Sequence, residues 1–93
     1  MSMSKYSVVI TTYEYDVLSQ NSLISITCAR QLKSVIKHGD EVELLITLSE
    51  LTDLIGYVAA EANHARSQKK SRDLNMICDY LEADEQDIKR QEL

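Results

Sequence analysis

One segment of this sequence, residues 47–64, has the pattern of an amphipathic helix and constrains the fold more than any other. Its apolar residues recur at three- and four-residue intervals, which places them on a single helical face. Thr47 is followed three residues later by Glu50, the spacing of a capping box, so the start of the helix is also encoded. We therefore predict a helix over residues 48–63 whose apolar face packs on a core. That face consists of Leu51, Leu54, Ile55, Val58, Ala59 and Ala62.

The length and composition predict a single small domain over residues 1–93, with one aliphatic core. Because the chain contains no Phe and no Trp, the core must consist of Leu, Ile and Val, with some of the five Tyr at its edge. A core of this kind leaves little stability to spare. We therefore expect a homo-oligomer, in the form of a dimer, whose interface adds to the buried surface.

The first fifteen residues contain the clearest strand pattern. Residues 5–15 are rich in β-branched and aromatic side chains, and we expect Tyr6, Val8 and Ile10 to face inward. A second short strand is predicted over 22–27, after a group of turn-forming residues. These two strands would pair antiparallel as a hairpin.

The complete set of predicted elements has the order ββαβαα, which is an α+β fold. A three-stranded mixed sheet carries helices on one face, and the last two helices form a C-terminal hairpin. The open edge of such a sheet invites edge-to-edge dimerisation or a partner strand. The predicted strands span about 5–15, 22–27 and 41–47, the predicted helices about 28–38, 48–63 and 71–88, and the tail over about 89–93 is expected to fray.

Two local features support these assignments. The dipeptide Ile-Thr occurs at 10–11, 26–27 and 46–47, and the latter two are each predicted to close a strand and precede a helix. Lys37 and His38 before Gly39 are typical of a helix end, where cations meet the negative end of the dipole.

A glycine lies in the interior of the helix predicted over 48–63. An interior glycine costs roughly 1 kcal/mol relative to alanine. Gly56 and the neighbouring Ala59, Ala60 and Ala62 therefore predict a small-residue surface that another backbone could approach closely.

The net charge of −5 argues against a general nucleic-acid binder and against binding to anionic membranes. The charge is nevertheless uneven, because residues 1–65 sum to −4, residues 66–72 to +4 and residues 73–93 to −5. The sequence shows neither a signal peptide nor an apolar run long enough to span a membrane. Its two cysteines are far apart and match no metal-ligand spacing. We therefore expect a cytoplasmic protein.

The sequence contains no recognisable catalytic motif, and we predict that the chain is not an enzyme. Cys28 and Cys78 lie on apolar helical stripes, where a free cysteine acts as a small hydrophobic residue rather than as a nucleophile. Glu61 and His64 have the Glu-x-x-His spacing of di-metal helical bundles, but the motif occurs once and such sites need it twice. We expect no bound metal and no cofactor.

The basic cluster between the last two helices is the one local anomaly. We predict an exposed loop over 66–72 close to the start of the last helix, where free backbone N–H groups favour an anion. A solvated connection that offsets the acidic tail is the alternative, and we favour it because clustered charges without aromatic residues are weak evidence for recognition. The candidate anion-binding or partner-binding residues are Arg66, Lys69, Lys70, Arg72, His64 and Glu61.

Two functional hypotheses follow from these observations. The first is a small non-enzymatic protein-interaction or regulatory module that self-associates. The second is a regulator that binds a phosphate-bearing ligand or nucleic acid through the basic loop 66–72.

Overall fold

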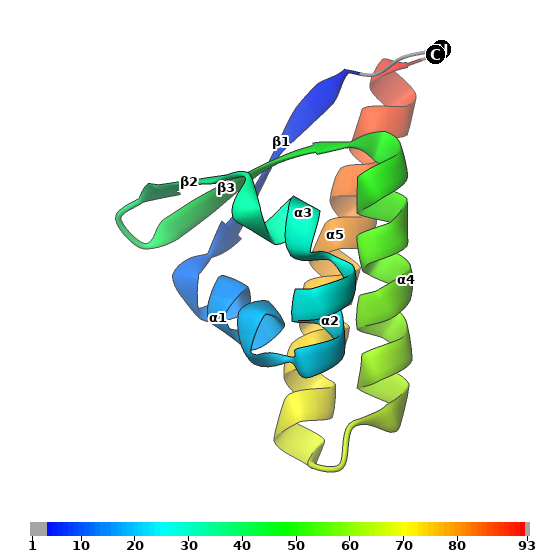
Figure 1. Ribbon diagram of the computed structural model, residues 1–93. Coiled ribbons are helices and arrows are strands. Elements are labelled where there is room, and N and C mark those ends of the chain that lie inside the picture. The colour runs from blue at the N-terminus through cyan, green and yellow to red at the C-terminus, as the bar shows by residue number, and fades with distance from the viewer. Residues whose placement is uncertain (1–3, 93) are drawn as a thin grey trace.

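The computed structural model describes residues 4–92 and confirms a small α+β fold with a three-stranded sheet and a C-terminal pair of helices (Figure 1). The element order is βαααββαα over the described residues, which corrects the predicted ββαβαα order in the first half of the chain. The elements are β1 (Lys5–Thr11), α1 (Thr12–Gln20), α2 (Ser22–Thr27), α3 (Ala29–Lys33), β2 (Val35–His38), β3 (Glu41–Thr47), α4 (Leu48–His64) and α5 (Gln68–Gln91).

The sheet is antiparallel throughout, with the strand order β1-β3-β2, and not mixed as predicted. β1 therefore pairs with β3, with Val8 opposite Leu44, rather than with residues 22–27. Side chains alternate between the two faces of each strand. Val8 and Ile10 are buried as predicted, whereas Val9 between them is 51% exposed.

β1 is shorter than predicted because a helix begins at Thr12. Thr11 accepts a hydrogen bond from Glu14 N–H at 3.1 Å, and the Glu14 side chain accepts one from Thr11 N–H at 2.7 Å. This is a complete capping box, the same arrangement that Thr47 and Glu50 form at the start of α4. Residues 12–15 are therefore helical, and the strand prediction for them is wrong.

Residues 22–27 form the helix α2, which corrects the strand predicted there. Asn21 caps this helix, because its side-chain oxygen accepts a hydrogen bond from Ile24 N–H at 2.9 Å. Ile24 is fully buried, whereas Ile26 is 77% exposed. The apolar residues of this segment thus serve one side of a short helix, and the Ile-Thr pair at 26–27 does not close a strand.

The single helix predicted over 28–38 is replaced by the short α3 and the strand β2. Gly39, with φ of +60°, occupies the first central position of a two-residue hairpin loop between β2 and β3. A positive φ at this position is the geometry that favours glycine in hairpins. Lys37 and His38 therefore end a strand and not a helix.

The last two helices pack side by side along the length of the molecule (Figure 1). Their buried apolar residues belong to the same core as the inward residues of the sheet. α5 extends to Gln91, three residues beyond the helix end predicted near residue 88. Ile88 is buried near its end, and the Lys89 amine lies 3.7 Å from the Glu85 carboxylate. The burial of Ile88 in the core gives the last turns a tertiary contact, and the Lys89–Glu85 pair adds a contact within the helix.

Gly56 lies on the exposed side of α4. Apart from its two chain neighbours and the adjacent backbone of α4 itself, no described atom comes within 4 Å of the position that a β-carbon would occupy there. At Gly56, therefore, no backbone from another element approaches closely within the described residues.

Candidate functional site

The predicted basic loop is mostly the first turns of α5. The helix starts at Gln68, three residues earlier than predicted, and Ser67 caps it by accepting a hydrogen bond from Lys70 N–H at 3.1 Å. Lys69, Lys70 and Arg72 are therefore helical residues on fixed sides of α5. Arg66 precedes the cap and is exposed.

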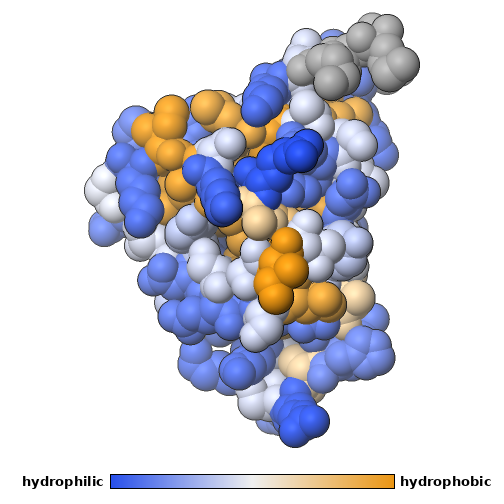
Figure 2. Space-filling view, viewed as in Figure 1, coloured by the Kyte–Doolittle hydropathy of each residue, from blue (hydrophilic) through white to orange (hydrophobic). Residues whose placement is uncertain are grey.

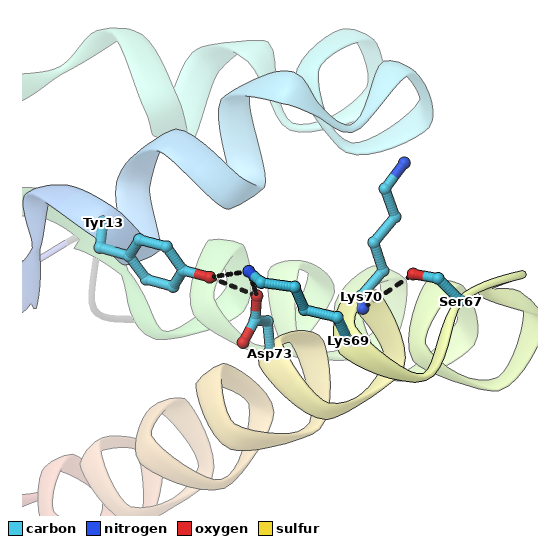
Figure 3. A network of polar contacts seen from close by, with 5 residues as sticks. All are labelled: Tyr13, Ser67, Lys69, Lys70 and Asp73. Atoms are coloured by element: carbon cyan, nitrogen blue, oxygen red, sulfur yellow. Dashed lines mark hydrogen bonds and ion pairs between the residues drawn. The ribbon is translucent and has the colours of Figure 1, made fainter.

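Lys69 is engaged with two side chains that join α1 to α5 (Figure 3). Its amine donates to Tyr13 Oη at 2.7 Å and lies 3.3 Å from Asp73 Oδ2, and Tyr13 Oη donates to the same oxygen at 2.5 Å. The Lys69 amine also lies 5.3 Å from the centre of the Tyr13 ring, within cation–π range. This positive charge is therefore already paired.

The electrostatics of this network follow from its hydrogen bonds. The hydrogen bond from Tyr13 and the nearby Lys69 hold the pKa of Asp73 below its usual value. Hydrogen bonds to Tyr13 and Asp73 raise the pKa of Lys69. Both groups therefore stay charged over a wide pH range, as expected of a structural tie between two helices.

The four cations do not converge on one point. Lys70 and Arg72 are two positions apart, and residues at that spacing lie on different sides of a helix. In Figure 3 the Lys70 side chain points away from the Tyr13–Lys69–Asp73 network. Among the described residues, neither Arg66 nor Lys70 forms an ion pair. Lys70 is thus the only one of the cluster's helical lysines with an unpaired charge.

Glu61 and His64 form no contact with the basic residues among the interactions of the described chain. Glu61 accepts a hydrogen bond from Asn21 Nδ2 at 2.9 Å, which ties the start of α2 to α4. His64 is the exposed last residue of α4. Within residues 4–92, no three His, Cys, Asp or Glu side chains are grouped so that they could hold a metal ion.

A cleft of about 470 Å³ lies between α1 and the start of α5. Of the six predicted site residues, only Lys69 and Lys70 line it, and the acidic Asp16 and Asp73 line it as well. Its charge is therefore balanced rather than strongly positive. The cleft lining also includes Tyr13, Val17, Gln20, Asn21, Ser67 and Leu74.

Both cysteines are buried, free thiols. Burial, together with the hydrogen bond to Glu82 and the charges of Glu82 and Asp79, raises the pKa of Cys78 to about 12. Burial and the nearby Asp53 also raise the pKa of Cys28. A raised pKa disfavours the thiolate, which is the nucleophilic form.

Sequence reasoning missed a second feature, an apolar groove of about 500 Å³ between β1 and α5. Val9 and Tyr13 line one side, and Met76 and Tyr80 of α5 line the other. All four side chains are between 45% and 55% exposed. Met76 and Tyr80 fall outside the buried stripe of α5, and only the path of β1 beside α5 brings them together with Val9. We call this feature the β1 groove.

Other exposed apolar side chains are visible in Figure 2 as orange patches, over α2 and α3 and over the β2–β3 end of the sheet. Leu23 and Ile26 of α2 and Ile36 of β2 belong to this class, with exposed fractions of 46%, 77% and 44%. These residues lie outside the lining of the β1 groove.

Over the described residues, every helix is too short or too polar to cross a membrane. Comparison of the chain with protein-family models, with curated proteins and with solved structures gave no match.

Proposed function

We propose that the chain is a small, non-enzymatic protein-interaction module that self-associates. The observation that carries this proposal is the β1 groove, where four large apolar or aromatic side chains remain half-exposed beside a sheet edge. Exposed apolar groups that lie together, rather than singly, are typical of protein interaction sites. Tyr and Met are also enriched at interfaces.

The chemistry of the described side chains favours binding over catalysis. The thiols have raised pKa values, and Lys69 and Asp73 are held in a structural network. A module that works by association needs none of these groups to react. It needs a surface that another chain covers.

Sedimentation velocity over a wide range of protein concentrations tests the proposal. We expect a monomer–dimer equilibrium that shifts toward monomer when Tyr80→Ser removes an aromatic side chain from the β1 groove. Ile26→Ser is the matched control, because it removes an exposed apolar side chain outside the groove, and it should leave the equilibrium unchanged. A wild-type chain that stays monomeric at every concentration would refute self-association.

We also propose, as the second candidate, that the cleft between α1 and α5 binds a phosphate-bearing ligand. The unpaired Lys70 amine at the rim of this cleft, close to the N-terminus of α5, supports it. When tripolyphosphate is titrated into the isotope-labelled protein, the NMR signals of the backbone amides in the first turn of α5 should shift. Lys70→Glu should abolish this response and Arg66→Glu should preserve it. Equal responses in both variants would refute a site in this cleft.

A further inference from the structure

We propose that the free edge of β1 is where two copies of this chain join, with the two β1 strands antiparallel and Ser7 at the two-fold axis. This inference rests on the proposed self-association and specifies its interface. β1 is an edge strand in the order β1-β3-β2, and its outer edge adjoins the β1 groove.

The hydrogen bonds at the ends of the sheet show which backbone groups of β1 point outward. Thr12 N–H donates to the Asp40 carbonyl at 2.9 Å, directly after the pair Thr11 and Glu41 in the β1–β3 register. Hydrogen-bonded pairs alternate along an antiparallel ladder, so the even-numbered residues of β1 bond to β3. The odd-numbered residues therefore direct their N–H and C=O groups to the free edge.

The β2 side of the sheet gives the same answer independently. Leu45 N–H donates to the Ser34 carbonyl at 3.2 Å, so the odd-numbered residues of β3 bond to β2. The even-numbered residues of β3 remain for β1, and the register pairs Val8 with Leu44 and Ile10 with Val42. The two assignments agree.

The groups available for a new strand are centred on Ser7. Thr11 is unavailable, because its N–H donates to the Glu14 carboxylate and its carbonyl lies at the helix start. Lys5, Ser7 and Val9 remain, and the register directs their backbone N–H and C=O groups away from β3. Two antiparallel copies therefore pair Ser7 with Ser7 and Lys5 with Val9 of the second copy, which satisfies all three residues of each strand.

Side-chain complementarity supports this register. On the inner face, Tyr6 of each copy lies opposite Val8 of the other. Val8 is already buried by its own chain, so the surface gained there is the part-exposed Tyr6 side chain. On the outer face, Lys5 of the second copy covers Val9, whose neighbour on β3 is Glu43. Lys5 of one copy, Val9 of the other and Glu43 next to that Val9 thus form one row of side chains across the joined sheet, with a cation and a carboxylate at its ends. The two Lys5 residues are not opposite each other.

The other edge of the sheet fits this role less well. β2 has four residues, and its Lys37 and His38 are exposed. Short, charged strands are how sheets block pairing at an edge. β1 has seven residues, and its outer edge adjoins the half-exposed side chains of Met76 and Tyr80.

Cysteine cross-linking tests the register directly. Residues paired across the axis have Cα atoms about 5.5 Å apart, within disulfide range. Ser7→Cys should therefore form a disulfide-linked dimer on mild oxidation. Val9→Cys is the matched control on the same strand and face, because two Val9 residues would lie about 14 Å apart along the paired strands. The natural cysteines are buried and should not compete.

Ser7→Pro tests the backbone pairing. Proline is tolerated at an edge position whose N–H faces away from the sheet, so the β1–β3 ladder should survive. The substitution removes two central hydrogen bonds from the dimer and should weaken it roughly 10- to 100-fold in sedimentation equilibrium. Circular dichroism checks that the variant folds. If it does not, the comparison of Ser7→Cys with Val9→Cys decides alone.

The outcomes separate this inference from the proposed function. A wild-type dimer, rapid cross-linking only of Ser7→Cys and a weakened folded Ser7→Pro variant support β1 pairing. A wild-type dimer in which Ser7→Cys cross-links no faster than Val9→Cys overturns β1 pairing and leaves self-association in place. A monomeric wild-type chain overturns both the proposed self-association and the pairing of two β1 strands.

Discussion

Asn21→Ala should destabilise the fold strongly, although Asn21 is a partly exposed polar residue. The Asn21 side chain makes two hydrogen bonds at once. Its oxygen caps α2 through Ile24 N–H, and its amide donates to the Glu61 carboxylate on α4, both at 2.9 Å. Alanine removes both bonds and leaves the start of α2 without a cap.

The magnitude follows from these two contacts. Loss of an asparagine N-cap costs about 1 kcal/mol, and loss of a partly buried hydrogen bond to a carboxylate costs about 1–2 kcal/mol. The six-residue α2 has too few turns to hold itself, and it carries the fully buried Ile24. We therefore expect the free energy of unfolding to fall by about 2–3 kcal/mol, a large share of the total for a domain of this size.

Urea denaturation followed by circular dichroism measures this change. Asn21→Ser is the matched control, because serine retains a capping oxygen but is too short to reach Glu61. We expect Asn21→Ser to lose about 1–2 kcal/mol, the cost of the hydrogen bond to Glu61 alone, so that the difference between the variants reports the cap. If the two variants are equally stable, or if alanine costs under about 0.5 kcal/mol, the assigned role of Asn21 is wrong.

Three further predictions follow. Gly56→Ala should raise the free energy of unfolding by about 1 kcal/mol, because the added methyl group meets open space and alanine favours a helix. Gly39→Ala should lower the free energy of unfolding, because φ is +60° at that position. Thermal denaturation of the two variants and the wild type measures both changes. Tyr13→Phe removes the main cause of the lowered pKa of Asp73. The variant should therefore be less stable than the wild type above the unfolded Asp73 pKa of about 3.8, and this difference should disappear as the pH falls through the lower folded pKa. Denaturation midpoints across a pH series test this, and a pH-independent difference would contradict it. Cys78 in the folded chain should react with iodoacetamide far more slowly at mildly alkaline pH than the unfolded chain does, since its pKa is raised to about 12, and equal rates would show an exposed thiolate.

The second half of the fold was predictable because local and tertiary signals agree there. Thr47 and Glu50 mark the helix start, and the buried residues Leu51, Leu54 and Val58 follow the expected helical spacing. The strand before them alternates buried and partly exposed residues, as a strand with one covered face should. No long-range contact was needed to recognise either element.

The first half contained signals that a closer reading could have used. Ile10-Thr11 is followed by Glu14 as Ile46-Thr47 is followed by Glu50, so the same strand end and capping box occur twice. The dipeptide Gly39-Asp40 between two apolar runs is also a recognised hairpin signal. The repeated unit is therefore carried by 10–14 and 46–50, and not by 26–27.

The remaining errors are of a kind that sequence reading does not resolve. Residues 22–27 have β-branched side chains that favour a strand, and their helical state depends on Asn21, on Glu61 forty residues away and on the burial of Ile24. The β1 groove and the tie of Lys69 to Tyr13 likewise join residues of distant segments. Charge clustering in the sequence could not show that Lys69 is paired with Tyr13 and Asp73.

The Tyr6 hydroxyl donates a hydrogen bond to the Glu92 carboxylate. This contact has a consequence for circular permutation of the chain. It places the start of β1 beside the end of α5, so a short linker between these two points would close the backbone into a ring without distorting the fold. New ends could then be opened in the exposed connection between α4 and α5, where Arg66 and Ser67 are exposed. In such a permuted chain β1 would become an interior segment of the sequence while remaining an outer strand of the sheet.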